Sequence, residues 1–158
     1  VKDGGQASFC TPLEQVIFAC RTGAKLVSVC ASKGATATSG YLQYRFGKPD
    51  SADPLDMLLP ESQLPAARVA TADNMPFSGG GASWMRFRRG DHAYVVYSGI
   101  GKWGPRGETQ ERAGVVVERN GKRIASLRCT GKDSGEMGPD WFQRVGLSAK
   151  GEDFDLPN

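Results

Sequence analysis

Histidine is nearly absent from this 158-residue sequence, with His92 as its single instance. The four cysteines, Cys10, Cys20, Cys30 and Cys129, follow one another at intervals of 10, 10 and 99 positions. Zinc and iron–sulfur sites use closely spaced pairs of ligands, so we predict no metal site and no cofactor. An even number of widely spaced cysteines instead predicts two disulfides and an oxidising compartment, either the periplasm or the outside of a cell. Free buried thiols in a cytosolic protein are the alternative.

Long hydrophobic runs and a large charge excess are also missing. No run reaches the length of a transmembrane helix, so we predict no membrane span. Lys and Arg number 20 against 17 Asp and Glu, a net charge of +3, with both signs interspersed, which does not favour a nucleic-acid partner. The sequence begins with Val1 and carries no signal peptide, which predicts a periplasmic or secreted product whose targeting segment has been removed. A lipid anchor before Val1 and the oligomeric state stay open.

Signs of catalysis are few. The sequence has no nucleophile elbow, and His92 lies beside a predicted hairpin tip, which does not favour Ser–His–Asp catalysis. The acidic residues gather in and near the tail, where a solvated surface is their usual place. We therefore predict no catalytic residue and keep a weak hydrolase only as a third possibility.

The segment GIGKWG (99–104) matches the dinucleotide-binding pattern G-x-G-x-x-G. That pattern needs a helix opening at the glycines, whose N-terminus holds the pyrophosphate. Here PRGETQ follows, without an apolar helical period. We therefore predict a flexible loop between strands that exposes Lys102, Trp103 and Arg106.

The dominant pattern is an alternation of apolar and polar residues with period two, which predicts an all-β fold. Asn120-Gly121 between two apolar runs predicts a type I′ hairpin, and GPDWFQRVGL, from Gly138 to Leu147, predicts a short C-terminal helix that begins at Pro139. Together these features predict a small antiparallel barrel or sandwich of about eight strands. The candidate strands are 16–20, 25–31, 41–46, 55–59, 67–72, 83–88, 92–98, 113–119 and 123–129.

This pattern divides the chain into three parts. We predict a flexible lead over 1–15, the antiparallel domain over 16–130, and a C-terminal extension over 131–158 that packs on it. In the strand SWMRFR, Met85 and Phe87 should face the core, while Trp84, Arg86 and Arg88 share the outer face.

SGGGASW, from Ser78 to Trp84, places three glycines between a hydroxyl and an aromatic, just before a strand. Together with FAC (18–20), YVVYSG (94–99) and LRC (127–129), it resembles the bacterial membrane-bound and periplasmic lysozyme inhibitors over about residues 16–129. The loop is similar to the family's S-G-S-G-A-x-Y motif, and YVVYSG looks like the strand that ends in its S/T-K-G motif. The family's second loop serine corresponds to Gly80 here, and its lysine to Gly99.

This resemblance implies a small β-barrel that blocks a lysozyme or related peptidoglycan hydrolase by inserting the loop into its cleft. The Ser78 hydroxyl and the backbone N–H groups of Gly79, Gly80 and Gly81 would donate hydrogen bonds to the cleft carboxylates, Trp84 would anchor the loop, and Lys102 would replace the missing lysine. The predicted contact residues are Ser78, Gly79, Gly80, Gly81, Ser83, Trp84, Tyr97, Ser98, Lys102 and Trp103.

The resemblance also implies a Cys20–Cys129 disulfide, which leaves Cys10 with Cys30; a Cys20–Cys30 pair stays open. Other interpretations of the function also stay open. One alternative is that the three glycines form only a turn or bulge. Another is that the protein is an immunity protein against a secreted cell-wall hydrolase. A further alternative is a peptidoglycan-binding module, in which the rings of Trp84, Tyr97 and Trp103 stack on sugars.

Overall fold

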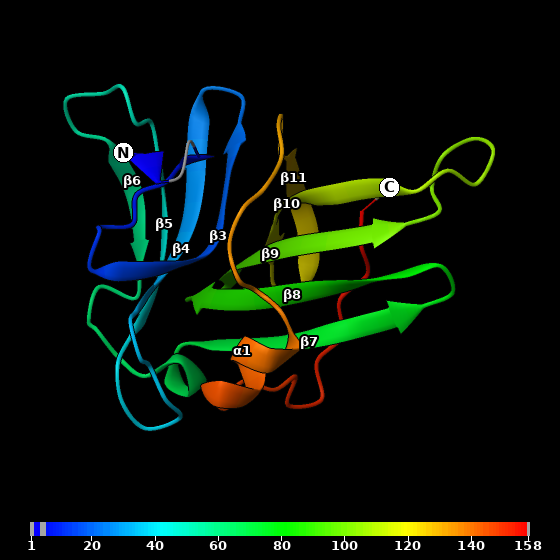
Figure 1. The fold of residues 1–158 in the computed structure, drawn as a ribbon. Coiled ribbons are helices and arrows are strands. Elements are labelled where there is room, and N and C mark those ends of the chain that lie inside the picture. The colour runs from blue at the N-terminus through cyan, green and yellow to red at the C-terminus, as the bar shows by residue number, and fades with distance from the viewer. Residues whose placement is uncertain (1, 4–5, 158) are drawn as a thin grey trace.

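The computed structural model describes residues 2–3 and 6–157 and shows two antiparallel sheets that pack face to face (Figure 1). The strand order is β11-β10-β9-β8-β7 in one sheet and β3-β4-β5-β6 in the other, and a short β1–β2 ribbon precedes them. The all-β prediction with a short C-terminal helix is confirmed, and the two separate sheets make the fold a sandwich. The strands are β1 (Lys2–Asp3), β2 (Gln6–Ala7), β3 (Glu14–Thr22), β4 (Lys25–Ser32), β5 (Leu42–Gly47), β6 (Leu55–Leu59), β7 (Ala70–Phe77), β8 (Gly80–Arg89), β9 (His92–Gly101), β10 (Gln110–Arg119) and β11 (Lys122–Arg128).

Local sequence accounts for most of these elements. Asn120 and Gly121 both have positive φ, 51° and 80°, as the predicted type I′ turn requires. The window 67–72 is wrong at its start, because a 3₁₀ turn (Ala66–Arg68) follows Pro65 and β7 begins only at Ala70. Strands β7 to β10 are also longer than predicted, since they continue through segments rich in Gly and Pro.

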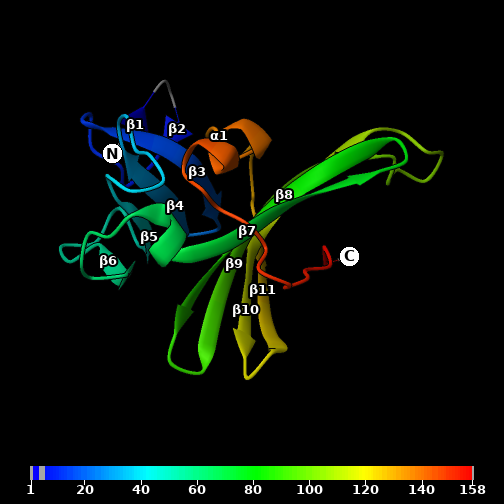
Figure 2. The same ribbon diagram turned by 90° about the horizontal axis from the view of Figure 1, so that it is seen from below.

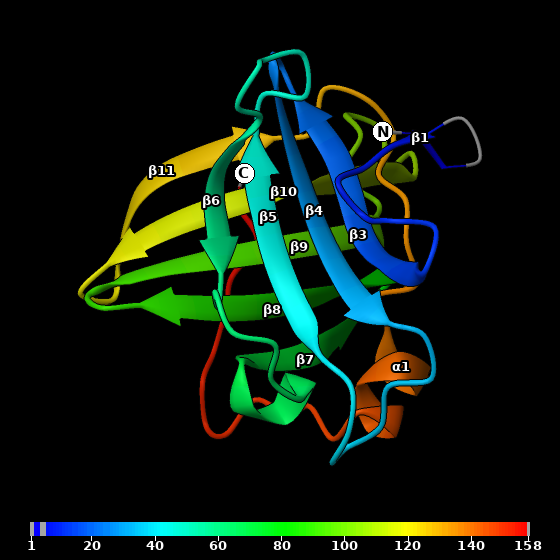
Figure 3. The ribbon, with the colours of Figure 1, turned by 90° about the vertical axis from the view of Figure 1, so that its left-hand side faces the viewer.

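The main core lies between the two sheets, whose strands run in crossed directions (Figure 3). Met85 and Phe87 of β8 face this core, as predicted, and the Phe87 ring lies 5.6 Å from the ring of Tyr44 on β5. Helix α1 (Pro139–Arg144) begins at the predicted proline and places Trp141 and Phe142 in the same core. The helix is the only one in the described residues other than the 3₁₀ turn, and neither is long and apolar enough to cross a membrane.

The C-terminal tail covers the outer face of the five-stranded sheet (Figure 2). Phe154 packs between Trp84 and Tyr97, with ring centroids 6.1 and 5.8 Å away. Arg86 lies on the same face, where it bonds to Glu152 of the tail. The alternation therefore predicted the correct face for Trp84 and Arg86, but both side chains are buried beneath the tail.

The N-terminal segment covers the outer face of the four-stranded sheet in the same way. The Phe9 amide donates to the Ser28 hydroxyl at 2.9 Å, and a disulfide joins Cys10 to Cys30. Ser8 and Cys10 are buried, and β3 begins at Glu14, so the segment from Ser8 onward packs on the sheet and differs from the predicted flexible lead.

The second disulfide, Cys20–Cys129, joins the first long strand to the segment that follows β11. The structure thus confirms the pairing that the family resemblance implied and excludes Cys20–Cys30. All four cysteines are oxidised, which fits an oxidising compartment.

Candidate functional site

Four strands of the larger sheet continue beyond the sandwich as a projecting arm, which we define as residues 74–83 and 98–111. The free end of the arm projects beyond the region where the two sheets pack together, at the right of Figure 1 and the upper right of Figure 2. This tip consists of the turn at Ser78 and Gly79 and the loop 102–109. The Lys102 side chain lies 3.0 Å from the position that a Cβ on Gly79 would occupy. Two predicted contact segments, distant in sequence, therefore meet at the tip.

An aromatic pair lies at the tip, with Phe77 exposed and Trp103 half-buried. Phe77 and Trp103 lie with ring centroids 5.8 Å apart, and the Arg112 guanidinium stacks 4.5 Å from the Trp103 ring. Phe77 is 37% exposed, and Ile100 on the opposite face of the arm is 45% exposed. Exposed aromatic and aliphatic side chains next to cations are typical of contact surfaces.

The glycines of the arm serve close packing between strands. A Cβ on Gly80 would lie 1.9 Å from the carbonyl oxygen of Ile100, and one on Gly101 would lie 2.7 Å from the Trp103 ring. Gly80 and Gly81 belong to β8, so the predicted glycine loop is in fact a two-residue turn in which Gly79 has a φ of +82°.

The first two glycines of GIGKWG also serve close packing between strands. Gly99 and Gly101 lie within β9, so the flexible loop predicted over 99–104 begins only after Gly101. A Cβ on Gly99 would lie 2.8 Å from that of Ala82, on the neighbouring strand. The glycine spacing is a packing requirement of paired strands and not a phosphate loop.

Trp84 and Tyr97 are part of the interior. Each exposes at most 1% of its surface, and the Arg86 guanidinium lies 5.0 Å from the Trp84 ring. Burial raises the pKa of Tyr97. Neither side chain can touch a partner while the tail is in place, which corrects two of the predicted contact residues. The same burial removes two of the three rings on which the sugar-stacking alternative relied.

Ser83 and Ser98 lie on the inner face of the arm, where they are opposite each other in the β8–β9 ladder. They form part of the floor of a groove of about 520 Å³ that we call the arm groove. Its wall includes Pro139 at the start of α1, and its floor extends from Asn74 on β7 to Glu111 on β10. Gly80 and Gly81 line it as well, so four predicted contact residues share this groove.

Comparison with family models, curated proteins and solved structures finds no match.

Sequence reasoning missed three residues in the strands beside the tip: Phe77, Ile100 and Arg112. The alternation of YVVYSG continues through Ile100, which could have extended the strand beyond Ser98. Phe77 follows a proline and precedes the glycines, so no periodic signal marks it. Arg112 becomes notable only through its contact with Trp103.

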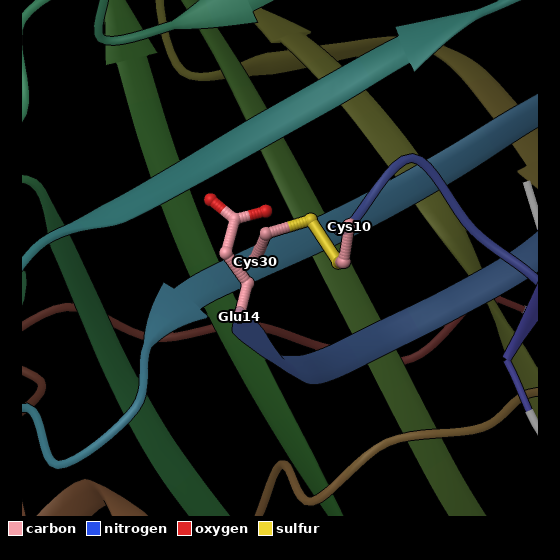
Figure 4. Close-up of side chains that lie close together, drawn as sticks. All are labelled: Cys10, Glu14 and Cys30. Atoms are coloured by element: carbon pink, nitrogen blue, oxygen red, sulfur yellow. A yellow bond between two sulfur atoms is a disulfide. The ribbon is translucent and has the colours of Figure 1, made fainter. Parts of the chain in front are cut away.

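One cluster of potential metal ligands occurs in the described residues, and it is already satisfied (Figure 4). The sulfur atoms of Cys10 and Cys30 form a disulfide and are therefore not thiolate ligands. The Glu14 carboxylate accepts hydrogen bonds from Arg45 at 2.7 and 2.8 Å, from the Thr11 amide at 2.9 Å and from the Tyr41 hydroxyl at 2.7 Å. These donors occupy the carboxylate, so the cluster stabilises the fold and holds no metal.

The lowered pKa of Glu14 makes the stability of the fold depend on pH. Burial alone would raise this pKa, but the bonds from Arg45, Thr11 and Tyr41 lower it from 4.5 to about 2. A lowered pKa stabilises the folded state above pH 4.5, and this stabilisation is lost as the pH falls towards 2. We expect unfolding free energies from urea titrations to lose about 3 kcal/mol through this group between pH 6 and pH 2.

Glu14→Gln should be less stable than the wild type at pH 6 and should approach it at pH 2, because the variant has no carboxylate to titrate. Glu61→Gln, which removes an exposed carboxylate, is the matched control and should follow the wild-type profile. A constant difference between Glu14→Gln and wild type at all pH values would contradict the assignment.

Proposed function

We propose that this protein is a periplasmic or secreted binding protein that inhibits a lysozyme or related peptidoglycan hydrolase. In this proposal the tip of the arm enters the enzyme's cleft and blocks it. The observation that supports it most is the meeting of Gly79 and Lys102 at the free end of the arm. Gly79 belongs to the segment that resembles the loop motif, and Lys102 lies three residues beyond Gly99, where the segment that resembles the second motif ends. Both residues are exposed.

The physical properties of the tip suit insertion into a cleft. Ladder hydrogen bonds hold its strands in register through Phe77–Gly80 and Gly101–Gln110, so little conformational entropy is lost on binding. Cleavage of a glycosidic bond uses a pair of carboxylic groups, and Lys102 supplies a positive charge that complements them. Phe77 and Trp103 supply the apolar area that dominates binding at most interfaces.

Trp103→Ala tests this proposal. We expect the variant to weaken inhibition at least about 30-fold, because truncation of a central aromatic contact typically costs 2 kcal/mol or more. Thermal stability should change little, since Trp103 packs on Phe77, Gly101 and Arg112 near the free end of the arm and belongs to neither hydrophobic core. Inhibition is measured as the release of soluble fragments from purified peptidoglycan by chicken-type, goose-type and invertebrate-type lysozymes and a lytic transglycosylase.

Leu13→Ala is the matched control, because Leu13 is 83% exposed, apolar and located on the N-terminal segment, outside the arm. It should inhibit as the wild type does. The proposal would be refuted if the wild-type protein slowed no hydrolase in the panel. Inhibition by Trp103→Ala equal to that of the wild type would show that the tip is not the inhibitory contact. Inhibition of a secreted cell-wall hydrolase alone would favour the immunity role.

A further inference from the structure

The arm groove differs from the tip in both chemistry and position. Two cross-strand rows form its floor, Pro76–Gly81–Ile100 nearer the tip and Asn74–Ser83–Ser98 nearer the sandwich. The next row inward belongs to the main core. The groove therefore occupies the inner face of the sheet where the four-stranded sheet no longer covers it.

The hydroxyl groups in this floor have already donated their hydrogens. Ser83 Oγ donates to Asn74 Oδ1 at 2.6 Å, and Ser98 Oγ donates to Asp133 Oδ2 at 2.7 Å. A hydroxyl that has donated its one hydrogen offers only lone pairs to a ligand. Among the described residues that line the groove, the Asn74 amide is then the only side chain that can donate a hydrogen bond.

The one charged side chain that lines the groove in the described part of the chain is negative. Glu111 lines it directly, and Asp133 is attached to its floor through Ser98. Within residues 2–3 and 6–157 no Lys, Arg or His lines the groove itself. Arg112, Arg128 and Lys132 line a separate hollow, which Glu111 and Asp133 also border. Beside these acceptors lie the apolar side chains of Ile100, Pro76 and Pro139. Lys and Arg side chains pack their methylene stems on such surfaces and place their charge at a polar group.

We propose that the arm groove binds a basic side chain, arginine or lysine, from the surface of a protein partner. The guanidinium or ammonium group donates to Glu111, Asp133 and the serine lone pairs, while the stem packs on Ile100 and Pro139. Complementary charge at the margin of an interface favours association and fixes orientation. The inference rests on the proposed function in one respect, that the partner is the hydrolase whose cleft the tip enters.

The test uses the disulfide-bonded protein of 158 residues and a short probe. Acetyl-Gly-Arg-Gly-amide is titrated into labelled protein and followed by amide chemical shifts, with the citrulline peptide as its uncharged isostere. We expect shifts at Gly81, Ser83, Ser98 and Glu111 with the arginine peptide and at least about threefold weaker binding of the citrulline peptide. Glu111→Gln and Asp133→Asn should each weaken the arginine peptide about three- to fivefold. Asp50→Asn makes the same charge change on the β5–β6 loop and should have no effect.

Equal binding of the two peptides, shifts confined to another surface, or no shifts at about 10 mM peptide would each overturn the groove proposal. Melting temperatures of the two groove variants within a few degrees of wild type exclude unfolding as the cause of a loss. No hydrolase is present in this titration, so its outcome is separate from that of the inhibition assay. Inhibition of a hydrolase without peptide binding would refute only the proposal that the groove binds a basic side chain. Peptide binding without inhibition would refute only the proposed function.

Discussion

Glu118→Ala is expected to lower the free energy of unfolding by about 3–5 kcal/mol, because it leaves the Arg86 guanidinium buried without its main partner. Arg86 is 6% exposed and donates to both carboxylate oxygens of Glu118, at 2.9 and 3.1 Å. It also donates to Glu152 at 2.9 Å and to the Asp153 carbonyl at 3.0 Å. The loss is measured by urea unfolding, and it should also loosen the tail that these bonds hold.

A double variant separates the charge from its packing. Arg86→Met with Glu118→Leu replaces the pair by apolar side chains and should recover most of the stability, since no charge is left buried. Arg119→Ala removes a partner of the exposed carboxylate of Asp91 and should have little effect. A loss in Glu118→Ala as small as that in Arg119→Ala would contradict the buried network.

Removal of the Cys20–Cys129 disulfide should be more damaging than removal of Cys10–Cys30. The first joins residues 109 positions apart and the second residues 20 positions apart. The entropy of the unfolded chain that a cross-link removes grows with loop length. We expect the double alanine variants to lose about 5 and about 3 kcal/mol, respectively, in urea unfolding.

The two disulfide variants are controls for each other, because each replaces two cysteines by alanine. The wild-type protein unfolded under reducing conditions provides the reference in which both links are open. Equal losses in the two variants would show that local packing around each sulfur pair outweighs the chain entropy.

The fold was predictable where local signals act alone. The alternation in β8 predicted which side chains face the main core, and Asn120-Gly121 and Pro139 predicted a turn and a helix start. These features depend on neighbouring residues only. The contacts between distant segments lie beyond such reasoning, as the burial of Trp84 shows, because Phe154 lies seventy positions later in the chain.

The positions of the predicted contact residues follow only in part from the sequence. Ser78, Gly79, Lys102 and Trp103 lie together at the tip, but Gly80 and Gly81 are strand residues. Glycine and proline lower β propensity, so a single sequence does not predict that β7 and β8 continue to the turn. Here that continuation depends on Gly80, where the close approach of the Ile100 carbonyl leaves no room for a side chain.

The late position of the tail in the chain has a consequence for biogenesis. Strand β8 is synthesised early, but Trp84 and Arg86 receive their cover only from residues 152–154. The five-stranded sheet therefore cannot reach its final packing until residues 152–154 have been synthesised, and contacts across such separations form slowly.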